Sequence, residues 1–235
     1  EAEKERMRGN LLRAVSHDLR TPLTSIYGAC SAMLENYDAL PRQTHMKLLS
    51  DVCADAQWLV RMVENLLSVT RVDTSTVRLS KNDTVLEELI DAVLVKFHKH
   101  YPDREVHVEI PEEFVSIPMD AMLISQVLMN LLENAVFHAK GMKNLWLRVE
   151  VKGLWAYFYV EDDGCGIPED KLPKLFTGML GSEMPTDQSR SSMGIGLSVC
   201  SAIIKAHGGE IWADKRDGGG TEVGFRLEME DENGE

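Results

Sequence analysis

The sequence has little cysteine, no stretch of basic residues and an excess of acidic ones. Its four cysteines lie far apart and form no C-x-x-C pair, so we interpret them as reduced thiols in a cytosolic setting. Cys30, Cys53 and Cys200 are expected at buried helix positions. The formal net charge is −13, which argues against a general binding surface for nucleic acid or for an anionic membrane.

Long apolar runs are also absent. No stretch approaches the roughly 18 apolar residues of a membrane-spanning helix, and no signal peptide is recognisable. The chain starts with a charged, helix-prone segment at residues 1–8 and without methionine, which predicts a piece of a longer protein. Its hydrophobic content of 44% is enough for the cores of the one or two domains that this length allows.

Two long amphipathic helices are predicted on either side of a break at residues 40–42, because apolar residues recur at spacings of three and four. In the first helix these residues are Leu12, Val15, Leu19, Leu23, Ile26, Cys30, Met33 and Tyr37. In the second they are Leu48, Leu49, Val52, Cys53, Ala56, Leu59, Val60, Val63, Leu66, Leu67 and Thr70. A hairpin of helices about 45 Å long cannot bury such a stripe alone, so we expect a second copy to complete a four-helix bundle.

The pattern after residue 74 predicts a two-layer α+β sandwich with a mostly antiparallel sheet. Helices are expected at residues 84–99, opened by a T-V-L-E capping box, at 121–139 and at 196–206, where Gly208 and Gly209 end the helix. Strands are expected at residues 76–79, 106–110, 114–117, 145–151, 156–160, 210–213 and 222–227.

Two motifs of this second part suit a phosphate-bearing ligand. N-L-L-E-N-A places Asn130 and Asn134 one helical turn apart, where two amide oxygens suit a hard cation such as Mg²⁺. G-I-G-L at residues 194–197 opens a helix, and glycines at a helix N-terminus offer backbone N–H groups to phosphate. Each motif is weak alone, and the combination is much stronger.

A third motif, D-D-G-C-G-I-P, suits a flat ring that carries an amine. Asp162 is predicted at the end of a strand, where its carboxylate accepts from an exocyclic amine. Gly164 and Gly166 follow, and residues without a side chain let the backbone approach the ring closely.

The first helix carries S-H-D-L-R-T-P-L-T, a cluster that a purely structural helix does not need. His17 stands beside the acid Asp18, and the hydroxyl of Thr21 lies one turn further on. Pro22 removes a helical donor and clashes with the carbonyl of Asp18, so a bend beside His17 is expected.

The order of these motifs, followed by G-G-G-T at residues 218–221, resembles the catalytic core of sensor histidine kinases, and the histidine motif is similar to that of the KdpD-like class. The resemblance covers nearly the whole chain. It implies a dimerisation and histidine-phosphotransfer domain at residues 1–74 and a Bergerat-type ATP-binding domain at residues 75–230. It also implies the cytoplasmic part of a membrane-anchored sensor, a part that makes no direct membrane contact.

The implied function is ATP-dependent autophosphorylation of His17 and phosphotransfer to an aspartate of a response-regulator receiver domain, by a homodimer joined through the hairpin. Asp18 would orient the imidazole or act as base, and Thr21 would position water when the partner is dephosphorylated. Asn134 would bind Mg²⁺ with Asn130 as its helper. The residues implied to bind ATP are Asn130, Asn134, His138, Asp162, Gly164, Gly166, Gly194, Gly196, Leu197 and Thr221.

Two alternatives remain open on the sequence. A hydrolytic ATPase of the gyrase and chaperone type would carry glutamate in place of Asn130, and asparagine cannot act as a base. A degenerate ATP-binding pseudokinase or scaffold, acting mainly as phosphatase or interaction module, is favoured by departures from the family pattern. Phe137 replaces a basic residue, for which Lys140, Lys143 and Arg190 are candidate substitutes. Met179 replaces the second aromatic of the F-box, and Ser192 replaces the first lid glycine.

Overall fold

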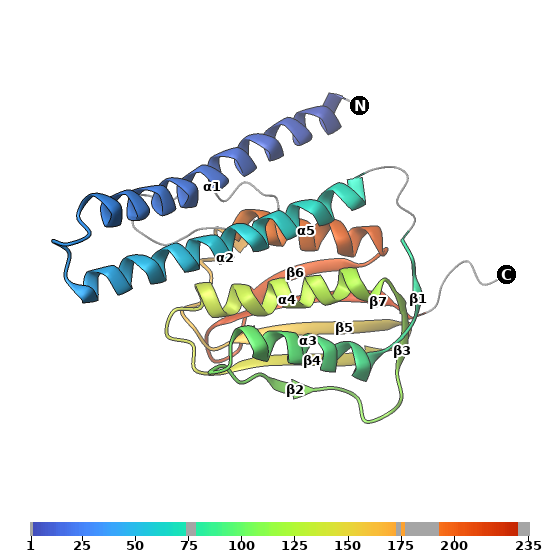
Figure 1. Ribbon diagram of the computed structural model, residues 1–235. Helices are drawn as coiled ribbons and strands as arrows, with labels where there is room; N and C mark the ends of the chain where they lie inside the picture. The colour runs from blue at the N-terminus through green and yellow to red at the C-terminus, as the bar shows by residue number, and fades with distance from the viewer. Residues whose placement is uncertain (1, 74–78, 173–174, 177–192, 230–235) are drawn as a thin grey trace.

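A helical hairpin forms the first part of the molecule. The computed structural model describes residues 2–73, 79–172, 175–176 and 193–229. Helix α1 (Ala2–Glu35) runs without interruption through Pro22, which is buried, and α2 (Arg42–Asp73) returns beside it (Figure 1). Backbone bonds from the N–H of Leu40 to the carbonyl of Asn36 and from the N–H of Thr44 to that of Pro41 shape the connection.

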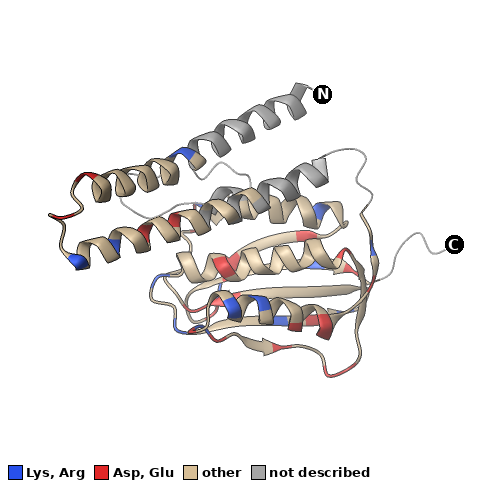
Figure 2. Cartoon of the chain, viewed as in Figure 1, with Lys and Arg blue, Asp and Glu red and all other residues tan. Residues whose placement is uncertain are grey.

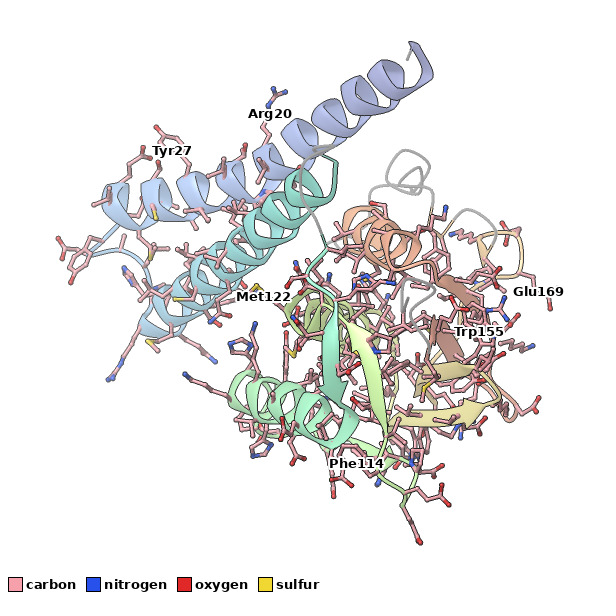
Figure 3. All side chains as sticks on the ribbon, turned by 90° about the vertical axis from the view of Figure 1, so that its right-hand side faces the viewer. Arg20, Tyr27, Phe114, Met122, Trp155 and Glu169 are labelled. Carbon is pink, nitrogen blue, oxygen red and sulfur yellow. The ribbon has the colours of Figure 1, made fainter. Side chains whose placement is uncertain are left out.

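The hairpin leaves large apolar side chains exposed. They are Leu23, Tyr27, Leu34, Tyr37, Met46, Leu49, Val60 and Val63. Figure 3 shows Arg20 and Tyr27 on the side of α1 that faces away from the rest of the chain. The expected burial of the helical cysteines holds for Cys200 only, since Cys30 is half-buried and Cys53 is exposed. Cys53 lies on the solvent side of the hairpin, where a two-helix layer cannot cover it.

A five-stranded sheet organises the second part, in the order β2-β4-β5-β7-β6. The central pair is β4 (Leu145–Lys152) and β5 (Trp155–Asp162), and β7 (Thr221–Glu228) and β6 (Glu210–Lys215) continue it antiparallel. The short edge strand β2 (His107–Glu109) pairs parallel to β4, so the sheet is mixed at that edge. Strands β1 (Asn82–Val85) and β3 (Ser116–Met119) form a separate antiparallel pair.

Three helices cover one face of the sheet, which gives the two-layer α+β architecture expected from the sequence. They are α3 (Leu86–His100), α4 (Ala121–His138) and α5 (Met193–Ala206) (Figure 1). Alternate residues of β4 and β5 point into the core between the layers, as period-two burial requires. The rings of Phe158 and Phe225 stack there at 4.6 Å between centroids.

The outer face of the sheet is covered by aromatic and charged side chains. Arg148, Lys152 and Arg226 lie over the rings of Tyr159, Tyr157 and Trp155 respectively. The alternating aromatic residues of β5 are therefore part of a sheet face. Basic and acidic residues are interspersed over the part of the chain that the structure describes, rather than gathered in a basic patch (Figure 2).

The start of the second part departs from the sequence-based prediction. Thr84 does not open a helix, because it belongs to β1, where it pairs with Ile117 of β3 and donates to the carbonyl of Asn82. Helix α3 follows Val85 without a side-chain cap, and the first N–H, that of Leu86, is bonded to the carbonyl of Val115. The expected strand at residues 76–79 falls largely outside the described residues, and Leu79 is not in a strand.

The helix ends near the site follow the sequence signals more closely. Asp120 caps α4, and its Oδ1 accepts from the N–H of Leu123 at 3.2 Å. Gly208 takes a left-handed φ of 79° two residues after the last residue of α5. Helix α5 begins at Met193, so Gly194 and Gly196 lie within its first turn.

The two parts of the molecule contact each other. Helix α2 packs against α5 (Figure 1), and Leu19 of α1 packs against the hydrophobic core of the second part. The helix that carries the histidine motif is thus joined to the α/β layer at a residue close to that motif.

Candidate active site

Asp162 lies at the last position of β5 and is only 6% exposed. Its Oδ1 accepts from the N–H of Gly164 at 2.9 Å. Thr221 stands opposite it in the ladder between β5 and β7 and bonds to it through both backbone and side chain. Burial raises the pKa of the Asp162 carboxyl, and the bonds from Gly164 and Thr221 act against that rise. A buried carboxyl with open lone pairs at a strand end can accept a hydrogen bond from a ligand.

Glycines allow the turn after Asp162 to fit between two other segments. A methyl group at Gly164 would lie 2.6 Å from the Cβ of Ala139, at the end of α4. One at Gly220, in the connection between β6 and β7, would lie 1.9 Å from the carbonyl oxygen of Asp162. Gly166 has a φ of +71° and approaches the carbonyl of Gly220. The glycine turn (residues 162–166) is therefore clamped on both sides, and only glycine fits at Gly164 and Gly220.

The two asparagines of α4 have different surroundings. Asn130 is 8% exposed, and its side chain lies beside the Cys200 thiol of α5. Asn134 is half-buried. Among the described residues, neither Nδ2 atom has a hydrogen-bond partner. The two residues do share one helix, as predicted, but Asn134 is the more accessible to a ligand.

The end of α4 borders the glycine turn. His138 is its last residue, and burial lowers the pKa of its imidazole. The carbonyl oxygen of His138 lies 3.6 Å from the Sγ of Cys165, so the ends of the two motifs are in contact.

Phe137 is 52% exposed and meets the ring of Tyr101 edge-on, at 6.0 Å between centroids. The hydroxyl of Tyr101 donates to Oε1 of Glu133 at 3.2 Å. The side chain of Glu133 therefore bonds to the residue that follows α3.

The segment that the sequence predicts to bind phosphate is described in part. Gly194 and Gly196 lie in the first turn of α5, and Leu197 is buried behind them. Leu175 of the F-box is fully buried, and Phe176 packs against the core. Met179, Arg190 and Ser192 lie outside the described residues.

The histidine motif is helical throughout. His17, Asp18 and Thr21 belong to α1, and Thr21 is exposed, while the side chains of His17 and Asp18 are outside the described residues. The hydroxyl of Thr24 donates to the carbonyl of Arg20 at 2.8 Å. Leu19 lies two residues after His17 in the sequence and packs against the hydrophobic core of the second part.

Sequence reasoning missed Asp163. Its carboxylate accepts from the backbone N–H groups of Lys143 and Asn144 at 2.7 and 2.9 Å. Asp163 is visible in the sequence as the second aspartate of D-D-G, but the sequence does not show that its partners are residues 143 and 144.

Comparisons with known proteins agree with this arrangement. Residues 7–75 match the family "His Kinase A (phospho-acceptor) domain", and residues 119–231 match the family "Histidine kinase-, DNA gyrase B-, and HSP90-like ATPase". The chain is 37% identical over 231 residues to Sensor protein KdpD of Clostridium acetobutylicum, a match that covers 98% of this chain and 26% of that protein. The chain thus spans about a quarter of the length of this relative.

Solved structures show the same fold. Histidine kinase AdeS of Acinetobacter baumannii superposes with a TM-score of 0.66 at 25% identity, covering 92% of this chain and 98% of that chain. Histidine kinase ThkA, solved in complex with response regulator protein TrrA, gives a TM-score of 0.73 at 24% identity, covering 97% of this chain and 64% of that one. In the part of the chain that the structure describes, no helix has both the length and the apolar character needed to cross a membrane. With a hairpin that matches the phosphoacceptor family, followed by a layer that matches the ATPase family, the chain belongs to the sensor histidine kinases, in a KdpD-like class.

Proposed function

We propose that this chain binds ATP at the glycine turn, between α4 and the start of α5, and transfers the γ-phosphoryl group to His17. The observation that carries the proposal is the buried Asp162 carboxyl, which bonds to Gly164 and Thr221. It lies at the start of the glycine turn, where side chains larger than glycine would clash at Gly164 and Gly220. In this assignment Asp162 accepts from the adenine amine, and Gly164 and Gly166 let the ring lie against the backbone. His138, at the end of α4, and Thr221 border the same end of the nucleotide.

The first turn of α5 would receive the phosphates. Gly194 and Gly196 add no side chain to this turn, and the positive end of the helix dipole favours an anion there. Leu197 is buried and would fix that turn on the core.

Magnesium fits the donors that α4 offers. In the described residues no group of three or more His, Cys, Asp or Glu side chains could hold a metal ion. A cation would therefore be held by the amide oxygen of Asn134 together with phosphate and water oxygens, the ligands that Mg²⁺ prefers. Asn130 lies beside Cys200 and would support Asn134 from behind rather than bind the cation directly. When bound, Mg²⁺ would neutralise charge on the phosphates.

The chemistry at α1 follows from the residue types. A neutral ring nitrogen of His17 attacks the γ-phosphorus, the bond from that phosphorus to the bridging oxygen breaks, and ADP leaves. Asp18 orients the ring and accepts the proton lost from it. Because Asn130 cannot activate water, the site favours transfer to His17 over hydrolysis. Thr21 is exposed one turn further on and would position water when a phosphorylated partner is dephosphorylated.

The same proposal extends to domains and partners. We assign residues 1–74 to dimerisation and phosphotransfer and residues 75–230 to ATP binding. The exposed apolar residues of the hairpin support a homodimer built as a four-helix bundle, and the partner that receives the phosphoryl group would be the aspartate of a response-regulator receiver domain. Sedimentation of the purified chain tests whether it forms a homodimer.

The activity is tested with γ-labelled ATP. The parent chain should acquire acid-labile label, and His17→Gln should acquire none while binding ATP as the parent does. Asp162→Asn should lose both binding and label. Label that persists in His17→Gln would refute the assignment of the phosphoacceptor. ATP binding by the parent without any label, together with faster loss of phosphate from a regulator, would favour a pseudokinase instead.

A further inference from the structure

The second aspartate of D-D-G makes three hydrogen bonds to one short segment. Asp163 Oδ1 accepts from the backbone N–H of Lys143 at 2.7 Å and from that of Asn144 at 2.9 Å. Its Oδ2 accepts from the side-chain Nδ2 of Asn144 at 2.7 Å. These bonds lower the pKa of the Asp163 carboxyl to about 2, so the group is a carboxylate at any pH at which the protein is used.

These bonds begin where the sheet ends. The ladder between β4 and β5 has its last pair at Leu145 and Asp162. Beyond that pair the carboxylate of Asp163 takes the place of a backbone carbonyl and binds the N–H groups of residues 143 and 144. The connection from α4 to β4 is thereby held at the edge of the glycine turn.

The segment that Asp163 holds is the one that ends α4. The N–H of Met142 donates to the carbonyl of Ala139 at 3.0 Å, so residues 139–144 form a tight connection. Ala139 in turn lies against Gly164, where a methyl group would find no room. The Sγ of Cys165 contacts the carbonyl of His138. Three successive residues of the glycine turn therefore contact the end of α4 or its connection.

We propose that Asp163 is a positioning residue, which fixes the end of α4 against the glycine turn and so sets the separation of Asp162 from Asn134. This inference rests on the proposed function, in which Asp162 binds adenine and Asn134 binds the cation at the phosphates. A ligand that spans both ends needs this separation, whereas a ligand that occupies only the adenine end does not. A misplacement of about 1 Å costs up to about 100-fold in rate where reacting groups must be aligned, and we expect a comparable loss of affinity for a ligand held at both ends.

The test compares two ligands on one variant. Asp163→Ala removes all three bonds, and its affinity for adenosine and for a non-hydrolysable ATP analogue with Mg²⁺ is measured by calorimetry well below its unfolding temperature. We expect the ATP analogue to bind about 10- to 100-fold more weakly than to the parent, and adenosine to bind within about threefold of the parent value. A residue that only stabilises the fold would leave both affinities unchanged under these conditions.

A swapped pair provides the rescue. In the double variant Asp163→Asn with Asn144→Asp, the new amide oxygen can accept from the two backbone N–H groups and the new amide nitrogen can donate to the new carboxylate. It should restore affinity for the ATP analogue to within about threefold of the parent. The control is Glu150→Ala, which removes a carboxylate bonded to Arg148 on the outer face of the same sheet and should change neither affinity.

Three results would overturn the inference. Unchanged affinity of Asp163→Ala for the ATP analogue would show that the separation does not depend on this residue. Equal loss for adenosine and for the analogue would assign Asp163 to the adenine end alone. A parent chain that binds neither ligand would overturn the proposed function itself, and the inference with it, and is distinguished from the other two because the parent fails.

Discussion

The imidazole of His207 joins the end of α5 to the start of α4. Its Nε2 accepts from the backbone N–H of Asp120 at 3.1 Å, and its Nδ1 lies 2.8 Å from the carbonyl oxygen of Ile203. Since a backbone N–H only donates, Nε2 carries no proton, and Nδ1–H donates to Ile203. The ring is 3% exposed. His207 is thus a neutral, buried link between two helices of the site.

This link predicts a loss of stability at mildly acidic pH. Burial lowers the pKa of His207 below the ordinary value of 6.5, an effect to which Lys81 adds and which the Ile203 carbonyl and Asp120 oppose. The unfolded chain therefore binds a proton at a higher pH than the folded chain does. The contribution of His207 to the free energy of unfolding is complete above pH 6.5 and decreases as the pH falls below it, until the folded-state imidazole also protonates.

His207→Ala should lower the free energy of unfolding by about 1–3 kcal/mol at pH 7.5, because the N–H of Asp120 loses its acceptor. It should also remove part of the decrease between pH 7.5 and pH 5.5. Urea unfolding at both pH values measures this. His98→Ala, at an exposed position of α3, is the control. If His207→Ala kept the full pH dependence of the parent, the link would not be its source.

The clamp on the glycine turn predicts that Gly164→Ala is harmful. Its methyl group would meet backbone and side-chain atoms of Ala139 at 2.6 to 2.8 Å, so the turn or the end of α4 must shift. We expect a loss of about 1–3 kcal/mol in the free energy of unfolding and weaker ATP binding. Gly28→Ala is the matched control, because nothing lies within 4 Å of the added methyl group in α1. There the substitution should stabilise the helix by up to about 1 kcal/mol. A Gly164→Ala variant as stable as Gly28→Ala would contradict the clamp.

Periodicity and end signals were sufficient to predict most of the fold. The spacing of apolar residues located both hairpin helices, and alternation located β4 and β5, because each pattern reflects burial of one face. Asp120 marked the start of α4 through its own side chain, which is a local interaction. The prediction that Thr84 opens a helix was wrong. Its capping motif competes with a non-local strand pairing to β3, and the strand pairing forms.

The sequence predicted those site residues whose place follows from the motif itself. It was less informative about residues whose surroundings depend on how helices and strands pack. Asp162, Gly164 and Thr221 lie together as the motifs suggested. Asn130 and Asn134 form a pair in sequence, yet Asn130 is buried beside Cys200 because α5 packs on that side of α4. Asp163 was missed because its partners, Lys143 and Asn144, face it only through the folding of the sheet.

The cysteines provide a chemical probe of the site. Cys165 is exposed at the glycine turn, and Cys53 is exposed on α2. Cys200 is buried, which raises the pKa of its thiol to about 12. N-ethylmaleimide should therefore label Cys165 and Cys53 in the native protein but not Cys200. An ATP analogue with Mg²⁺ should slow labelling of Cys165 and leave that of Cys53 unchanged, as followed by peptide mass spectrometry. Equal rates at Cys165 with and without the analogue would place the nucleotide elsewhere.

The contact between Thr221 and Asp162 predicts how ATP binding depends on pH. In the proposed function, adenine binding needs the ionised carboxylate of Asp162. Burial raises the pKa of this group, so affinity should decrease at a higher pH than for an ordinary aspartate. The hydrogen bond from the Thr221 hydroxyl lowers that pKa, so Thr221→Val should move the decrease to still higher pH. Adenosine affinity measured from pH 8 to pH 5 in parent and variant tests this. Thr84→Val, which removes a hydroxyl bonded only locally in β1, should leave the profile unchanged. A profile that Thr221→Val leaves in place would mean that another group controls adenine binding.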